Sequence, residues 1–345
     1  MRVLLISNMY PSIQKPYSGI FVKNQYEALR KKLGPNIHIK YMKRRLTNPI
    51  GSILKYLFFI IQLFPVYFKR YEVIHFHYFY LLIFLIPYKW FYPKTKFVVT
   101  FHGQDILKIK IHSKLLPVLQ YMAQKVDCFL PVGQKVASEA ESKLNIKTFS
   151  IIPVGVNEKV FYPHKNELKI YDFIFVGSFY HVKGIDIIVK AIKQLDQNAK
   201  NMRFCFVGTG PYKNELNSLN TITNIDILGP KTHKELRKLY NCSRFFLSHS
   251  RSEGFPTAPL EAMYCGIPVL ASNIQQCKEQ VINAANGWLV ELGNVNALSN
   301  KILLLTQLSG SDYKLHSKHA LKANRGVELG NITNKLVAIY KHLGS

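Results

Sequence analysis

The sequence is poor in acidic residues and in cysteine. It has 20 Asp and Glu against 46 Lys and Arg, which gives a net charge of +26 over 345 residues. Its five cysteines are scattered, odd in number and form no C-x2-C pair, which argues against a disulfide framework or a structural zinc site and fits a reducing cytosol. There is no internal repeat and no low-complexity segment. The length suits two domains, each able to bury its own core.

Apolar runs long enough to span a bilayer are also missing. Two aromatic-rich, charge-free runs, residues 56–68 and 73–88, have 13 and 16 residues and fall short of the roughly 20 that a span requires. The apolar stretch at residues 1–8 is too short for a signal peptide and predicts a first β-strand. Residues 73–87 fit a buried core. Residues 54–68 are apolar nearly all round, with Lys55 at their start and the pair Lys69 and Arg70 directly after them.

The chain alternates short apolar runs with helical patterns, as βαβ units do, and the alternation restarts near residue 172. Strands are predicted at residues 2–7, 37–41, 72–77, 96–101, 128–132 and 149–153, and then at 172–176, 203–207, 225–228, 244–248, 269–271 and 287–290. Helices are predicted at residues 21–33, 54–68, 81–90, 115–125, 134–143, 185–195, 212–218, 234–241, 257–265 and 332–343. A polar linker is predicted at residues 157–169.

The most informative segment is residues 252–272. Glu253 and Glu261 stand eight positions apart, the first in a loop marked by glycine and proline and the second in the opening turns of a predicted helix. The free N–H groups at such a helix start suit a phosphate, and carboxylates accept hydrogen bonds from sugar hydroxyls. A glutamate early in a helix is also stabilising by itself, by about 0.3–1 kcal/mol, so the spacing alone does not prove a site.

The segment Glu253-Gly-Phe-Pro-Thr-Ala-Pro-Leu-Glu261, followed by Ala-Met and Cys265-Gly-Ile-Pro-Val-Leu-Ala-Ser272, resembles the donor-site signature of the family-4 retaining glycosyltransferases. The resemblance implies an α/β fold of the GT-B type, with two Rossmann-like domains whose parallel sheets face a central cleft. It implies an N-terminal acceptor-side domain at residues 1–160, a nucleotide-sugar domain at 170–330, and a C-terminal helix at 331–345 that crosses back to the first domain.

Further motifs follow in the order of that family. The segment Val176-Gly-Ser-Phe-Tyr-His-Val-Lys-Gly184 forms a glycine turn after a predicted strand, where Lys183 could supply a point charge for phosphate or could simply be solvated. Lys183 matches the family's diphosphate lysine, and Ser178 stands where the family usually has an arginine. The turns at residues 206–212 and 227–231 and the segment 152–161 also resemble family segments.

The first half carries two further matches. Gly19 opens a predicted helix where the family has a glycine-rich loop, and His102 matches a pocket histidine that faces the donor sugar. By itself a lone histidine after a strand is more often structural. Asp105 is close enough to join a pocket or to act as an N-cap.

Residue roles follow from the resemblance. Glu261 is expected to hold the donor ribose, Glu253 the transferred sugar, and Lys183 the leaving diphosphate. The segment Gly254, Phe255, Pro256 and Thr257 is expected to contact sugar and phosphate. No metal ion or other cofactor is required if Lys183 and helix ends supply the positive charge. A glycosidase would also use two carboxylates, but loops suited to phosphate favour transfer.

The excess positive charge is uneven and points to an anionic partner: nucleic acid, a membrane surface or a phosphorylated substrate. Residues 1–170 hold 26 Lys and Arg against 8 Asp and Glu. Basic clusters at residues 30–32 and 43–45, together with the apolar residues 54–68, suit peripheral docking on an anionic membrane surface. No RNP-like, helix-turn-helix, KH or zinc pattern is present, so no specific nucleic-acid partner is expected, although nonspecific binding follows charge alone.

The sequence therefore predicts a retaining hexosyltransferase. It would use a nucleotide-diphosphate sugar, with UDP as the expected base, and a saccharide or lipid-linked acceptor, as in cell-surface polysaccharide or glycolipid synthesis. We expect it in the cytoplasm, peripheral on the inner face of the cell membrane. The alternative is a non-catalytic subunit that binds a nucleotide sugar or a lipid and derives from such an enzyme, and Ser178 is the feature that favours it.

Overall fold

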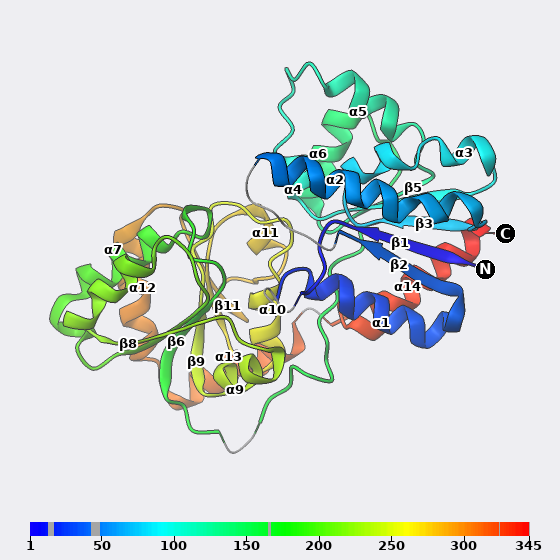
Figure 1. The fold of residues 1–345 in the computed structure, drawn as a ribbon. Coiled ribbons are helices and arrows are strands. Elements are labelled where there is room, and N and C mark those ends of the chain that lie inside the picture. The colour runs from blue at the N-terminus through cyan, green and yellow to red at the C-terminus, as the bar shows by residue number, and fades with distance from the viewer. Residues whose placement is uncertain (13–16, 43–48, 165–166, 324, 345) are drawn as a thin grey trace. The chain divides into compact units, whose positions relative to one another are not determined.

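A computed structural model describes residues 1–12, 17–42, 49–164, 167–323 and 325–344 (Figure 1). The chain forms two compact units. Unit 1 comprises Met1–Gly155 together with Gly326–Ser345, and unit 2 comprises Val156–Arg325. The basic cluster at residues 43–45 and part of the predicted linker at 157–169 lie outside the described residues.

Unit 1 is built on a five-stranded parallel sheet with the strand order β2-β1-β3-β4-β5. Its apolar strands are buried because helices cover both faces, as parallel sheets require. The strands are β1 (Val3–Ser7), β2 (Ile37–Tyr41), β3 (Val73–Phe76), β4 (Lys96–Phe101) and β5 (Cys128–Pro131).

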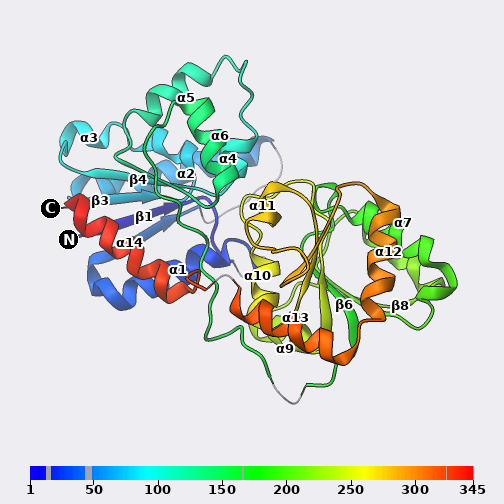
Figure 2. The same ribbon diagram turned by 180° about the vertical axis from the view of Figure 1, so that it is seen from behind.

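The helices of unit 1 lie in two layers, one on each side of this sheet (Figures 1 and 2). One face is covered by α1 (Ile20–Leu33) and α14 (Leu329–Gly344), whose apolar residues share a core with β1 and β3. The other side carries α2 (Pro49–Leu63), α3 (Tyr88–Phe91), α4 (Gln104–Leu107), α5 (Leu116–Ala123) and α6 (Gln134–Leu144). The 3-10 helices are η1 (Gly34–Asn36), η2 (Phe64–Phe68) and η3 (Phe79–Phe84).

Unit 2 is built on a six-stranded parallel sheet with the strand order β11-β10-β9-β6-β7-β8. Each strand is followed by a helical segment, so the unit is a succession of βα units. The strands are β6 (Tyr171–Val176), β7 (Arg203–Val207), β8 (Asn224–Leu228), β9 (Ser243–Leu247), β10 (Val269–Ser272) and β11 (Gly287–Val290).

Helices cover both faces of the second sheet as well (Figure 1). One core joins the sheet to α7 (Ile185–Leu195), α8 (Lys213–Asn217) and α12 (Val295–Thr306). The other side carries α9 (His233–Asn241), α10 (Thr257–Tyr264) and α13 (Gly310–Lys322), and α10 packs against both of the others. The shorter helices are α11 (Gln275–Lys278), η4 (His181–Lys183), η5 (Asp196–Ala199) and η6 (Ser218–Thr221).

The fold class expected from the sequence is confirmed, since both halves are α/β units with parallel sheets. Two element predictions are wrong. Residues 149–153 form no strand; their backbone only donates two hydrogen bonds of 3.0 Å to β5, from Ser150 and Ile152. The helix predicted at 81–90 is interrupted, because Pro87 lacks an N–H donor and separates η3 from α3.

Among the residues that the structure describes, no helix combines the length and the apolar character that a membrane span requires.

Candidate functional site

The strand order of unit 2 reverses between β6 and β9. From β6 the chain winds outward through β7 and β8, and from β9 it winds the other way through β10 and β11. In open parallel sheets, ligands bind beyond the carboxyl ends of the strands at such a switch point. Three loops meet there: residues 177–184 after β6, 208–212 after β7 and 248–256 after β9. The predicted residues Ser178, Lys183 and Glu253 are on these loops.

Glycines allow these loops to pack backbone against backbone. Gly184 has φ +68°, and a Cβ there would lie 1.9 Å from the carbonyl oxygen of His249. Gly208 has φ +152°, and a Cβ there would lie 1.9 Å from the carbonyl oxygen of Gly177. Only glycine fits such close approaches. The loop that carries Lys183 is therefore held directly against the loop that leads to Glu253.

Lys183 and Glu253 form an ion pair at the switch point. The Lys183 ammonium donates to both carboxylate oxygens of Glu253, at 2.6 and 2.8 Å, although the two residues are 70 positions apart. The Gln276 side chain from α11 donates to the Glu253 carbonyl at 2.7 Å and fixes the backbone there. Both charged side chains are partly buried, so each compensates the other while remaining reachable by a ligand.

Glu261 lies in the second turn of α10. The hydroxyl of Tyr240, a fully buried residue of α9, donates to Glu261 Oε2 at 3.1 Å. Burial raises the pKa of the Glu261 carboxyl to about 8, against which the Tyr240 hydrogen bond acts only in part. Glu261 is therefore mostly protonated at neutral pH until a ligand supplies donors for its carboxylate.

The start of α10 presents unpaired backbone donors. Pro256, the N-cap, is extended and provides no side-chain cap. Within the described chain, the amides of Gly254, Phe255 and Thr257 donate to no acceptor. These amides lie between Glu253 and Glu261 in the chain and at the positive end of the helix dipole, an arrangement that suits an anion.

Ser178 is exposed and offers no guanidinium at the position where the resembled family has an arginine. Arg251, which directly precedes the segment 252–272, makes two hydrogen bonds of 2.7 Å to Asp186 and one of 2.6 Å to the His181 carbonyl. The Arg251 charge holds the pKa of the Asp186 carboxyl below its usual value. Sequence reasoning missed this clamp, whose only signal was a basic residue two positions before Glu253.

In unit 1 the switch point lies between β1 and β3. Gly19, the N-cap of α1, has φ +68°, and a Cβ there would lie 2.5 Å from the backbone of Met9. The α1 start thus folds back on the loop after β1. Phe21 in the first turn of α1 contacts the imidazole of His102, with ring centroids 4.8 Å apart. The structure therefore brings the predicted residues Gly19 and His102 to one edge of the sheet.

His102 belongs to a stack of three histidines. His77 Nδ1 and His102 Nε2 are 3.2 Å apart, and the ring of His77 stacks on that of the buried His75. Burial lowers the pKa of His75 and of His102 to about 3, and it lowers the pKa of His77 well below its usual value. All three imidazoles are therefore neutral at physiological pH. The two additional histidines had appeared in the sequence only as parts of a core strand.

Asp105 has a structural position. It is fully buried, and its carboxyl accepts from the amides of His102 and Gly103, at 3.1 and 3.0 Å, and from that of Phe79 at 3.4 Å. Burial raises the Asp105 pKa to about 7 against these hydrogen bonds. It shapes the turn that follows β4 and so orients His102, rather than forming the N-cap of α4, which is Gly103.

Two parallel α/β units, each with a switch point at the carboxyl edge of its sheet, define the GT-B class. A solved structure of this class, Anabaena HepE in complex with UDP-glucose, matches with a TM-score of 0.77 at 14% identity over 99% of this chain and 100% of that chain. A likeness at this identity establishes the fold.

The chain belongs to the family-4 glycosyltransferases. The family model described as Glycosyltransferase Family 4 matches residues 20–160, and the one described as Glycosyl transferases group 1 matches residues 157–322. An uncharacterized glycosyltransferase of Methanocaldococcus jannaschii, MJ1178, is 32% identical over 60% of this chain and 58% of the relative. The putative colanic acid biosynthesis glycosyltransferase WcaL of Escherichia coli is 26% identical over 62% of this chain and 56% of the relative. The matches thus span little more than half the length of these relatives.

Proposed function

We propose that the protein is a retaining glycosyltransferase that moves a hexose from a UDP-sugar to a saccharide or lipid-linked acceptor. The observation that carries this proposal is the Lys183–Glu253 pair at the switch point of unit 2, beside the unpaired amides at the start of α10. The UDP-glucose bound by HepE supports the donor class. The name of WcaL supports a role in polysaccharide synthesis.

Each residue of the site then has a chemical task. Glu261 accepts hydrogen bonds from the donor ribose and Glu253 from the transferred sugar. The Gly254–Thr257 segment, with Phe255 and Pro256 fixing its course, offers amides to sugar and phosphate. Lys183 neutralises the charge that develops on the leaving diphosphate, which is the principal catalytic requirement. We propose that Lys183 and the α10 amides perform this task without a metal ion.

Residues of unit 1 complete the proposal. The neutral imidazole of His102 can donate to or accept from a sugar hydroxyl without an energetic cost for losing a proton. Gly19 exposes the first amides of α1 at the same edge of the sheet. Ser178 contributes at most a neutral hydroxyl to the diphosphate. Lys183 therefore compensates more of the diphosphate charge than the matching lysine does in family members that also have the arginine.

Nucleotide release tests the donor site. First, a thermal-shift screen of nucleotide sugars identifies the donor, because a true ligand stabilises by mass action. Then Lys183→Ala, Glu253→Ala and Glu261→Ala are each expected to lower kcat/KM about 100-fold or more, since each removes a charged contact to the reacting donor. Glu215→Ala, which changes an exposed glutamate on α8, is the matched control and is expected to retain activity. Wild-type turnover in all three site variants would show the assignment to be wrong.

One observation favours a second candidate function. Because Ser178 lacks the arginine charge and Arg251 is already bound to Asp186, the diphosphate clamp is reduced. A non-catalytic subunit that binds a nucleotide sugar or a lipid would share this feature. If calorimetry shows that the donor binds, but no product forms over a long incubation with any acceptor tested, the non-catalytic subunit is favoured. Formation of a glycosylated product would show that the protein is an enzyme.

The peripheral position at the inner face of the cell membrane is a separate proposal. It depends on a surface of unit 1 and on none of the residues that would bind the donor. The excess of basic residues in the first half supports an anionic partner of this kind.

A further inference from the structure

The outer face of α2 is apolar, which reverses the usual pattern of a surface helix. Its inner face is buried at Phe59 and Leu63, and the ring of Phe59 lies edge-on to that of Phe84 in η3, with centroids 6.0 Å apart. Exposed large apolar side chains recur every three or four residues on the opposite side and continue into η2. This stripe consists of Leu54, Leu57, Phe58, Ile61, Phe64 and Phe68.

The stripe is well exposed and carries almost no charge. Ile61 is 67% exposed and Phe68 is 71% exposed, and Lys55 is the one formally charged residue among the fifteen of α2. Soluble surfaces rarely expose contiguous apolar patches of this kind unless they bind something. A leaflet of lipid is one medium in which such a stripe is stable.

The short helix α3 extends the apolar surface. The Tyr92 hydroxyl donates to the Tyr67 carbonyl at 3.1 Å, and the rings of Tyr67 and Phe91 are 6.2 Å apart, so α3 lies beside η2. Trp90 on α3 is 78% exposed. Exposed tryptophan is typical of the level where headgroups meet acyl chains. We call the stripe together with Trp90 and Phe91 the apolar face.

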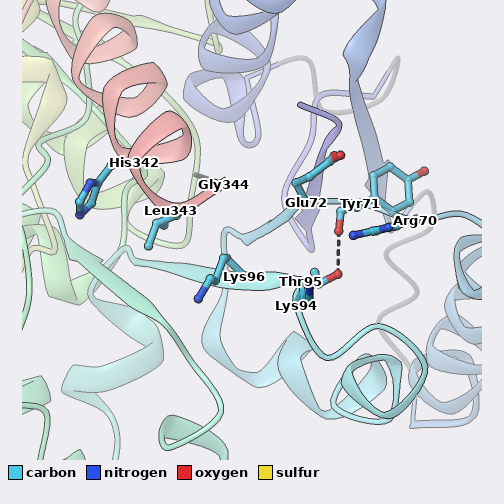
Figure 3. Close-up of a pocket in the computed structure, with 9 residues that line it drawn as sticks. All are labelled: Arg70, Tyr71, Glu72, Lys94, Thr95, Lys96, His342, Leu343 and Gly344. Atoms are coloured by element: carbon cyan, nitrogen blue, oxygen red, sulfur yellow. Dashed lines mark hydrogen bonds between the residues drawn. The ribbon is translucent and has the colours of Figure 1, made fainter.

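A basic pocket borders the apolar face. The chain leaves η2 into Arg70 and leaves α3 into Lys94, and both residues line a cavity of about 530 Å³ (Figure 3). Lys96 also lines the cavity, where its ammonium pairs with Asp127 at 3.7 Å, and Glu72 is the one acidic residue of the lining. A hydrogen bond of 2.6 Å from Thr95 to the Tyr71 carbonyl fixes the two wall segments to each other.

The surrounding sequence has the same sign of charge as the pocket. Between residues 54 and 96 it has six basic residues and one acidic residue; Arg70, Lys94, Lys96 and Glu72 line the pocket itself, and the other three basic residues lie outside it. Within the described residues Arg70 and Lys94 form no ion pair, so their charges are available to a ligand. An apolar surface rimmed by unpaired cations is complementary to a leaflet that contains anionic phospholipids, and less so to a second copy of this basic chain.

We propose that the apolar face and the basic pocket form a membrane-docking surface. The apolar face enters the headgroup and acyl boundary of one leaflet, and the pocket receives the phosphate of anionic lipid headgroups. The long stems of Lys94 and Arg70 let their charged ends remain at headgroup level. Docking uses none of the donor-site residues, so failure of sugar transfer and failure of docking are separable results.

Vesicle flotation tests the proposal. Wild-type protein is expected to float with vesicles of phosphatidylcholine and phosphatidylglycerol, and much less with phosphatidylcholine alone. The pair Ile61→Glu and Phe68→Glu is expected to weaken binding about tenfold or more, because two inserted side chains become charged. Leu304→Glu is the matched control, since Leu304 is a 57% exposed residue of α12 in unit 2.

Charge reversal tests the pocket. The pair Arg70→Glu and Lys94→Glu is expected to weaken binding to the anionic vesicles about tenfold and to reduce its salt dependence. Lys190→Glu on the exposed side of α7 is the control for a single change of charge elsewhere. Equal loss in this control would mean adsorption by net charge alone and would overturn the proposal.

The two tryptophans permit a direct measure of insertion. Trp288 is buried in unit 2 at 7% exposure, whereas Trp90 belongs to the apolar face. In a Trp288→Phe background, brominated lipids are expected to quench Trp90 fluorescence on binding. Absence of quenching in bound protein would overturn insertion. A second result would also overturn the proposal. If the wild-type protein is a dimer, and the Ile61→Glu and Phe68→Glu pair abolishes the dimer but leaves vesicle binding intact, a second copy of the chain covers the apolar face.

Discussion

At the scale of single residues, the Lys183–Glu253 contact shows how two partly buried charges of the proposed site stabilise each other. A lysine and a carboxylate about 4 Å apart attract by about 4 kcal/mol at the effective dielectric constant of a protein surface. A diphosphate offers Lys183 an equivalent or stronger partner, and sugar hydroxyls offer the same to Glu253. On donor binding, Lys183 and Glu253 then exchange each other for the diphosphate and the sugar hydroxyls, with little net desolvation of either charge. The exchange leaves both side chains in the contacts proposed for catalysis.

Glu261 illustrates a different principle, since its charge depends on the ligand. Burial raises its pKa from 4.5 to about 8, so the carboxyl is mostly protonated at neutral pH. Ribose hydroxyls that donate to the carboxylate favour its ionised form. Donor binding and deprotonation are therefore coupled.

We predict that donor binding at pH 7 releases close to one proton from Glu261. Calorimetric binding enthalpies measured in buffers of different ionisation enthalpy give this number, and Glu261→Gln is expected to reduce it to near zero.

The same raised pKa favours the folded state below pH 4.5, and this contribution is lost as the pH rises through about 8. Glu261→Gln should therefore flatten the pH dependence of unfolding between these values. Identical proton release in the variant would contradict the coupling.

At the scale of elements, the site depends on loops that approach each other at the backbone. Gly184 ends the 3-10 turn of Lys183 and begins α7, and its Cα faces the His249 carbonyl. This contact positions Lys183 relative to the loop after β9. Arg251 secures the same two loops through Asp186 and His181.

We predict that Gly184→Ala destabilises unit 2 by about 3 kcal/mol or more, because a left-handed alanine is strained and its Cβ would overlap the His249 carbonyl. Gly229→Ala is the matched control, since nothing lies within 4 Å of a Cβ there. It is expected to change stability by less than about 0.5 kcal/mol. Chemical denaturation measures both, and equal stability of the two variants would contradict the close packing.

Elements are predictable from sequence to different degrees for physical reasons. The central strands β1 and β6 are buried on both faces, so each forms a short apolar run between polar turns, and prediction succeeds. Residues 79–91 are apolar on every side, which leaves no periodicity to distinguish a helix from 3-10 turns. The helices α12 and α13 were not predicted, although Asn294 and Ser309 cap them through hydrogen bonds of 2.9 and 3.1 Å.

The candidate site divides in the same way. Glu253, Gly254 and Glu261 belong to one local motif, so their proximity in the chain is visible in the sequence. The ion pair of Lys183 with Glu253 and the clamp of Arg251 on Asp186 join residues 70 and 65 positions apart. Such contacts depend on strand order, which a single sequence does not specify. Tyr240, the partner of Glu261, was missed for the same reason.

At the scale of the whole molecule, the C-terminal segment packs in the same unit as the N-terminal strands. The last helix, α14, belongs to unit 1 and packs beside α1 over the first sheet. Its Tyr340 is fully buried and hydrogen-bonds to His75 Nδ1 at 2.5 Å, while His75 Nε2 bonds to Thr100 at 2.7 Å. The C-terminal segment thus completes the polar interior beneath the histidine stack that ends at His102.

We predict that Tyr340→Phe destabilises unit 1 by about 1–3 kcal/mol, because it keeps the ring but leaves a buried nitrogen of His75 without its partner. Tyr121→Phe is the matched control, since Tyr121 is an exposed residue of α5 and its hydroxyl has no such role. Hydrogen exchange locates the effect: β3 and α14 should exchange faster, whereas the sheet of unit 2 should be unchanged. Because His77 stacks on His75, the loosened interior should also disturb His102 and lower transfer activity. Faster exchange spread evenly over both units would show that α14 is not specific to the first sheet, and the folding role assigned to Tyr340 would then be wrong.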